Sequence, residues 1–238
     1  MLILTRKINE SIVHICSGGF EPGDQVFCEV NGERRNAIQK NHTATHLMHR
    51  ALKNILGDHV NQAGSLVHPE YLRFDLTHSE KISKDEILCV ENEVNKQILL
   101  NNKLEVSIQN FDDAKKSGAE ALFGEKYGEE VRVVEMGNYS VELCGGTHVE
   151  RTGDIGSFKI IEESSLSSGV RRIVALTGEA SVKEMQKNNS ILNSLQSLLN
   201  TPPDFMEDRI FTLLKEKKDL EKKIKSNDSG FSIADLLS

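Results

Sequence analysis

The amino-acid sequence predicts an α+β fold that ends in a helical tail. Two long stretches, about 33–56 and 84–101, carry apolar residues at helical spacing, and short β-type runs lie around and between them. Beyond Gly178 the β-type runs stop and two further helical stretches follow. A chain of 238 residues can bury a sizeable core without the help of disulfides.

The first residues are expected to form strands. Residues 11–16 and 25–30 are β-type runs on either side of the Gly- and Pro-containing stretch 18–24, a pattern that predicts a hairpin. Two or three strands are not stable alone. Residues 1–32 are therefore interpreted as strands of a partial β-barrel that needs support from another part of the protein.

The helix expected at 33–56 has a clear apolar stripe and ends before Gly57, a residue type that favours helix termination. The stripe consists of Ala44, Leu47, Met48, Ala51, Leu52 and Ile55. Strands are expected at 72–76, 104–109, 131–136, 139–143, 156–162 and 170–177, with a short helix at 111–122 that ends at Gly124.

The C-terminal part is expected to be two helices, 179–200 and about 205–225, separated by Thr201-Pro202-Pro203. Leucine and isoleucine recur in the second helix at roughly heptad spacing, which is typical of a short coiled coil or helical hairpin that could join two copies of the chain. A solvated amphipathic helix is the alternative. The expected domains are 1–32, 33–178, 179–226 and a tail at 227–238.

Composition excludes several protein classes. The net charge of -7 argues against a broad nucleic-acid-binding surface, so any contact with nucleic acid must be local, and DNA is not an expected partner. No apolar run reaches about 18 residues, which argues against a membrane span. The start of the chain has no signal-peptide pattern, and four cysteines are too few for a disulfide scaffold, so a reducing cytoplasm is expected.

Two histidines on the first helix are the first candidates for chemistry. His42 and His46 are four residues apart, so their side chains lie one turn apart on one helix face. That face is nearly opposite the apolar stripe, so the pair is either solvated or directed into a separate cleft. Two imidazoles at this spacing can bind a divalent metal ion, above all zinc.

The second candidate motif is Cys144-Gly145-Gly146-Thr147-His148. Alone, Cys144 is typical of a small buried apolar residue, and His148 of a hydrogen-bonded turn residue. Together with His42 and His46 they complete a set of four nitrogen and sulfur ligands that zinc prefers, which favours a metal site. His49 lies on the same helix face and is interpreted as an outer or exposed residue rather than a ligand.

Five motifs in the same order resemble the editing domain of alanyl-tRNA synthetase and its freestanding trans-editing relatives. They are NHTATHL (41–47), QAGSLV (62–67), LRFD (72–75), ELCGGTH (142–148) and GVRRI (169–173). The resemblance covers about residues 8–225 and implies an α+β editing-domain fold shared with the editing region of threonyl-tRNA synthetase. Since the aminoacylation domain of a full synthetase is missing, the chain is expected to be a freestanding protein or a fragment.

The resemblance implies an aminoacyl-tRNA deacylase, an ester hydrolase that removes serine, and also glycine, from mischarged tRNA(Ala). A site that binds alanine cannot strongly reject either of these amino acids, so a second site is needed. By the resemblance, His42, His46, Cys144 and His148 hold Zn²⁺, and Thr45 and Gln62 are the catalytic residues beside the aminoacyl group.

Arg171 and Arg172 are candidate contacts for the tRNA backbone, because arginine pairs well with phosphate. The alternative is a pair at a strand edge, of which one arginine makes a salt bridge. Two other functions stay open at this stage. One is a non-catalytic fragment with a structural zinc and a tRNA-binding or oligomerisation role, and the other is a threonyl-type editing module.

Overall fold

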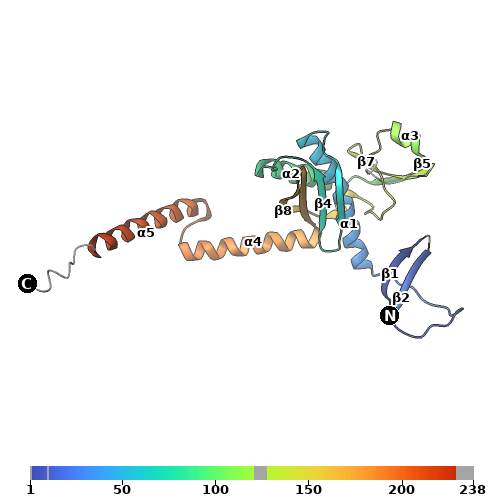
Figure 1. Cartoon of the computed structure of the whole chain (residues 1–238), viewed down its shortest axis with the longest axis horizontal. Coiled ribbons are helices and arrows are strands. Elements are labelled where there is room, and N and C mark those ends of the chain that lie inside the picture. Colours follow the sequence, from blue (N-terminus) through green and yellow to red (C-terminus); the bar gives the residue numbers. More distant parts are fainter. Residues whose placement is uncertain (1, 10, 121–127, 229–238) are drawn as a thin grey trace, which may run out of the picture. The chain divides into compact units, whose positions relative to one another are not determined.

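The computed structural model describes residues 2–9, 11–120 and 128–228, and the chain divides into two compact units, one up to Gly32 and one from Glu33 onward (Figure 1). Helices and antiparallel sheets occur together in the larger unit, so the predicted α+β class is confirmed. No described helix is both long and apolar enough to cross a lipid bilayer.

The first unit contains one antiparallel hairpin, made by β1 (Leu2–Ile8) and β2 (Ser11–Cys16). The predicted pairing of residues 11–16 with residues 25–30 is wrong, because residues 25–30 form no strand. A short connection after Ile8 brings the first two strands together, and Asn9 has the positive φ of 55° that tight hairpin turns require. Residues 11–16 therefore pair with the strand that precedes them, β1, rather than with residues 25–30.

The centre of the second unit is α1 (Gly32–Leu56), which ends at Gly57 as predicted. Gly57 has a φ of 113°, and its N–H donates to the carbonyl of Lys53. The helix is buried on nearly all sides between Asn41 and His49, so its polar face is covered as well as its apolar stripe.

A four-stranded antiparallel sheet and α2 (Lys84–Leu100) build the main core with α1. In spatial order the strands are β3 (Gln62–Val67), β4 (Leu72–Thr77), β9 (Val170–Thr177) and β8 (Phe158–Ser167). Alternate residues of β4 point inward, and Phe74 lies opposite Ile173 in the neighbouring strand. Ser83 and Glu86 form a reciprocal capping box at the start of α2.

Two segments of this sheet lie outside the strands predicted at 72–76, 156–162 and 170–177, and both are strands. Gln62–Val67 pairs with β4, and the register shift between Gln62 and Gly64 is a β-bulge. A Cβ atom at Gly64 would lie 3.1 Å from Asp75 Oδ2, so this glycine serves a close approach within the sheet rather than a loop. Likewise β8 continues to Ser167, and its serines pair with β9.

A second sheet has the order β5 (Leu104–Asn110), β6 (Glu130–Met136) and β7 (Ser140–Leu143). It packs on α3 (Phe111–Lys116) through a small core of its own. The helix is shorter than the predicted 111–122, because Gly118 adopts a φ of 89° just beyond it. The predicted end at Gly124 lies outside the described residues.

After β9 the chain continues into α4 (Gly178–Leu199), a short 3-10 turn (Pro203–Phe205) and α5 (Met206–Asp228). Two helices separated by the Pro202-Pro203 pair are as predicted. Many of their leucine, isoleucine and phenylalanine side chains are exposed. Association of two copies through these helices stays a prediction, as do the four domain boundaries, and most of the expected tail at 227–238 lies outside the described residues.

Replacing Phe74 by alanine tests this core. Phe74 is fully buried, so Phe74→Ala removes a large side chain and leaves a cavity, and we expect the free energy of unfolding to fall by about 3–5 kcal/mol. Urea denaturation followed by circular dichroism measures the change. Phe205→Ala, at a side chain that is 60% exposed, is the control. Equal losses in the two variants would contradict the packing described here.

Candidate metal centre

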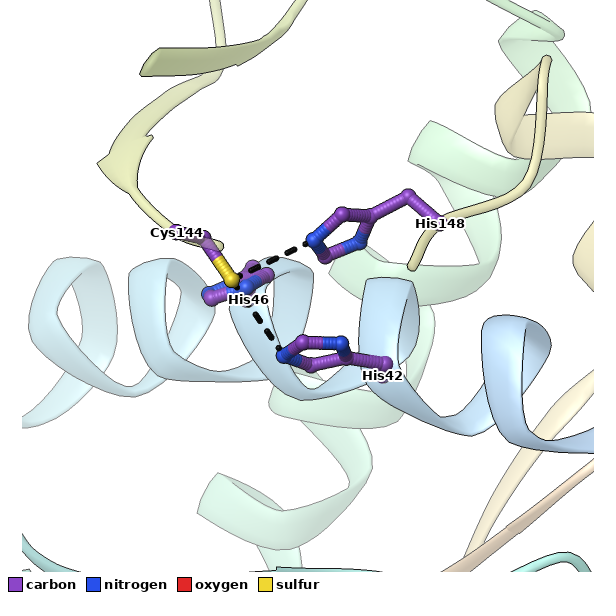
Figure 2. A group of neighbouring side chains, drawn as sticks. All are labelled: His42, His46, Cys144 and His148. Atoms are coloured by element: carbon purple, nitrogen blue, oxygen red, sulfur yellow. Dashed lines mark hydrogen bonds between the residues drawn. The ribbon is translucent and has the colours of Figure 1, made fainter. Parts of the chain in front are cut away.

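Two segments about one hundred residues apart in the sequence meet at the candidate centre (Figure 2). Helix α1 presents His42 and His46 one turn apart, as their spacing predicts. The turn that follows β7 presents Cys144 and His148. The four side chains point toward one another, with the sulfur of Cys144 between the rings of His42 and His148 (Figure 2).

The ligand atoms of these four residues all lie within 4.8 Å of one another. Cys144 Sγ is 3.4 Å from His42 Nε2 and 3.3 Å from His148 Nε2. The centroids of the three imidazole rings are 4.3–5.1 Å apart. One sulfur and three nitrogens therefore converge on a space of the size that a single metal ion needs.

Gly146 is what lets the turn approach the helix so closely. A Cβ atom at Gly146 would lie 2.1 Å from His42 Cε1, far inside any permitted contact. The neighbouring Gly145 has no atom near its Cβ position. The Gly-Gly pair is thus asymmetric, and only its second residue is required by the contact with His42.

The outward nitrogen of each histidine has a partner of its own. His42 Nδ1 donates to the carbonyl oxygen of Thr147 at 3.2 Å. Thr43 Oγ1 gives its proton to the carbonyl of Gln39, so it accepts from His148 Nδ1 at 3.2 Å. A proton held on each Nδ1 leaves the Nε2 lone pair directed inward, as metal-binding histidines require.

His46 follows the same pattern through a carboxylate. Its Nδ1 lies 2.9 Å from Glu142 Oε2, and both side chains are buried. Its Nε2 is also buried and has no hydrogen-bond partner among the described residues. A buried polar atom without a partner is rare, and a metal ion at this place would satisfy it. The residues present therefore fit a divalent transition-metal ion.

The pKa values of Cys144 and His148 suit this fit. Burial raises the pKa of the Cys144 thiol, but its contacts with the imidazoles of His148, His42 and His46 outweigh burial and lower the pKa to about 3. Burial lowers the pKa of His148 to about 4. At neutral pH Cys144 is thus a thiolate and His148 a neutral imidazole, which are the forms that bind metal ions. Burial lowers the pKa of His46, but Glu142 and Cys144 outweigh burial and raise it to about 10, so a metal ion bound here would displace a proton from this imidazole.

Glu142 and Thr43 were missed as functional residues. Glu142 lies in β7, where Ser140 and Glu142 face inward and Val141 is only partly buried. In the sequence a single glutamate between Val141 and Leu143 resembles the solvent-facing residue of an alternating strand. Glu142 is buried because α1 lies against this strand, and the spacing of residues along the sequence does not reveal that contact.

Of the two predicted catalytic residues, Thr45 is next to His46 in α1, whereas Gln62 lies in β3. Thr45 is buried, and its hydroxyl donates to the carbonyl of Asn41 at 2.8 Å. Gln62 is half-buried at the start of β3, opposite Leu76. Their roles beside an aminoacyl group stay predictions.

The two arginines predicted to contact tRNA are engaged within the sheet. Arg172 makes a two-pronged ion pair with Asp75, at 2.7 and 2.9 Å. Arg171 donates from Nε to Glu163 at 2.6 Å. The alternative was a salt bridge for one of these arginines, and the structure has an ion pair for both. A contact with tRNA stays a prediction for these residues.

Comparison with known proteins gives a consistent result. A family model described as "Threonyl and Alanyl tRNA synthetase second additional domain" matches residues 131–174, which include Cys144 and His148. Alanine–tRNA ligase of Clostridioides difficile is 47% identical over 228 residues, or 94% of this chain and 26% of that protein.

Two other alanine–tRNA ligases show similar agreement. The Thermotoga maritima protein is 49% identical over 216 residues, which is 90% of this chain and 25% of the relative. The Idiomarina loihiensis protein is 45% identical over 221 residues, which is 92% of this chain and 26% of that relative. The chain spans about a quarter of the length of the curated relatives that it matches.

The asymmetry of the Gly-Gly pair gives a test of the centre. We expect Gly146→Ala to bind much less than one Zn²⁺ per chain, because the new methyl group displaces His42. Gly145→Ala is the matched control and should bind one Zn²⁺ per chain. Elemental analysis of dialysed protein, with the fold checked by circular dichroism, measures both. Full zinc content in Gly146→Ala would rule out the arrangement described.

Proposed function

The chain is related to alanine–tRNA ligases over nine tenths or more of its length, and we propose that it hydrolyses the ester bond that joins a wrong amino acid to tRNA. The convergence of three imidazoles and one thiolate carries the proposal. The match to the second additional domain of threonyl and alanyl tRNA synthetases supports it. The proposed substrate is tRNA(Ala) that carries serine or glycine.

The reaction adds water to the ester carbonyl, releases the ribose oxygen of the tRNA and leaves a free amino acid. A Zn²⁺ ion held by the four ligands would supply Lewis acidity for a water or for the carbonyl oxygen. The chain's own residues hold and orient these ligands, through Thr43 at His148 and Glu142 at His46.

A hollow beside the cluster offers space for a substrate. It measures about 390 Å³ and is lined by His148 together with Asn36, Gln39, Lys40, Val149, Glu150 and Asp154. Gln39 donates to the carbonyl of His148 and so holds the wall next to the ligand in place. Amide and charged side chains of this kind suit the polar end of an aminoacyl-tRNA.

The need for a separate editing site follows from the size of the amino acids. Serine adds one hydroxyl to alanine and glycine lacks one methyl group, and a pocket for alanine discriminates weakly against either. A site that hydrogen-bonds the serine hydroxyl would leave alanine without a partner there. We keep Thr45 and Gln62 as the proposed contacts of the aminoacyl group, on the strength of the resemblance of their motifs.

One observation favours a second candidate function. All four ligands of the cluster come from the protein, which is typical of structural zinc sites. In that case the chain would be a tRNA-binding or oligomerisation module without activity of its own. Cys144→Ala separates the two functions, because a structural site would lose its fold and a catalytic site only its turnover.

The direct test is hydrolysis of mischarged tRNA. We expect the zinc-loaded protein to release serine from Ser-tRNA(Ala) and to leave Ala-tRNA(Ala) intact, with Cys144→Ala inactive but folded. Cys89→Ala, at an exposed cysteine away from the cluster, is the control and should stay active. Acid-precipitable radioactive serine measures the reaction. Stable Ser-tRNA(Ala) at high protein concentration would refute the proposal, and preferential cleavage of Ser-tRNA(Thr) would favour a threonyl-type module.

A further inference from the structure

A fifth polar residue, His49, belongs to the same helix face as the ligands but does not reach the cluster. It lies about one turn beyond His46 in α1 and is only 5% exposed. Its Nδ1 is 3.6 Å from Glu142 Oε1. The other oxygen of Glu142 faces His46. One carboxylate therefore lies between a metal-ligand histidine and a histidine that is not a ligand.

Glu142 has few other means of keeping this position. It is 1% exposed, and its further hydrogen bond comes from the hydroxyl of Ser140, which donates to Oε1 at 3.4 Å. A buried carboxylate is costly unless charged or polar groups surround it. The two imidazoles and Ser140 supply those groups, and His49 and Ser140 both act on Oε1.

The ring of His49 is packed against the sheet and also borders a hollow. The ring packs against Phe74 of the sheet, with centroids 5.2 Å apart. It also lines a hollow of about 150 Å³ together with Arg50, Lys53 and Tyr139. Its Nε2 is buried and has no partner among the described residues, so Nδ1 is the nitrogen that it uses toward another side chain.

We propose that His49 is a positioning residue of the metal centre. By contacting Oε1 of Glu142 it keeps Oε2 against His46 Nδ1, and His46 Nε2 thereby stays turned toward the other ligands. A residue with no atom in the cluster thus contributes to metal affinity through a carboxylate. This inference rests on the proposed zinc site and does not require that the site be catalytic.

The test compares two substitutions of similar size. His49→Leu removes the nitrogen, whereas His49→Asn places an amide nitrogen close to the position of Nδ1. We expect His49→Leu to weaken Zn²⁺ binding by about 10-fold or more, as loss of an outer partner of a metal ligand typically does, and His49→Asn to restore most of the affinity. Competition with a chromophoric chelator measures the affinity. His59→Leu, at an exposed histidine beyond α1, is the control and should bind as the unaltered chain does.

Cobalt substitution adds a readout that a role in folding alone would not change. We expect the visible absorption bands of Co²⁺-loaded His49→Leu to differ from those of the unaltered chain, because His46 is reoriented, and those of His49→Asn to match them. Equal zinc affinity in all variants would overturn the role of His49. So would equal loss in both His49 variants with unchanged cobalt spectra, since that result indicates a role in stability only. If the unaltered chain bound no Zn²⁺, both the metal site and this inference would fail, whereas failure to cleave Ser-tRNA(Ala) would affect neither.

Discussion

The close contact between α1 and the turn after β7 determines what this protein can do. The two segments meet where Gly146 lies against the ring of His42, so closely that a residue with a Cβ atom would not fit there. This contact brings Cys144 and His148 onto the histidines of the helix. It also covers a polar helix face that would otherwise be solvated, so the ligands lie in a largely buried place where electrostatic interactions are strong.

Burial of this polar face demands partners, and the structure supplies one for each ligand. Thr147 and Thr43 hold the outward nitrogens of His42 and His148, and Glu142 faces that of His46. The arrangement directs the Nε2 atoms of three histidines and the sulfur of Cys144 to one point. The partners of His42 and His148 are an uncharged carbonyl and an uncharged hydroxyl. Glu142 is the exception, and its pKa is held well below the usual range by His46 despite the opposing effect of burial. A negative carboxylate behind a histidine ligand strengthens the affinity of that ligand for a cation.

The cluster of His42, His46, Cys144 and His148 could be predicted from the sequence because its chemistry is carried by spacing within two short motifs. Most helices and strands were predictable for the same reason, since apolar periodicity is local. Glu142 could not be identified, and His49 only as an outer or exposed residue, because their contacts depend on β7 lying beside α1. The errors at β2, β3 and β8 have a related cause. The partner of β2, the whole of β3 and the end of β8 depend on which strands pair and on the close approach of Gly64 to Asp75, and apolar periodicity reveals neither.

The most direct test of the central claim is zinc K-edge X-ray absorption of the purified chain. One sulfur ligand at about 2.3 Å with the remaining ligands nitrogen or oxygen at about 2.0 Å is the predicted first shell, and histidine outer-shell scattering should be present. A first shell without sulfur, or with two or more sulfurs, would contradict a centre built from His42, His46, Cys144 and His148.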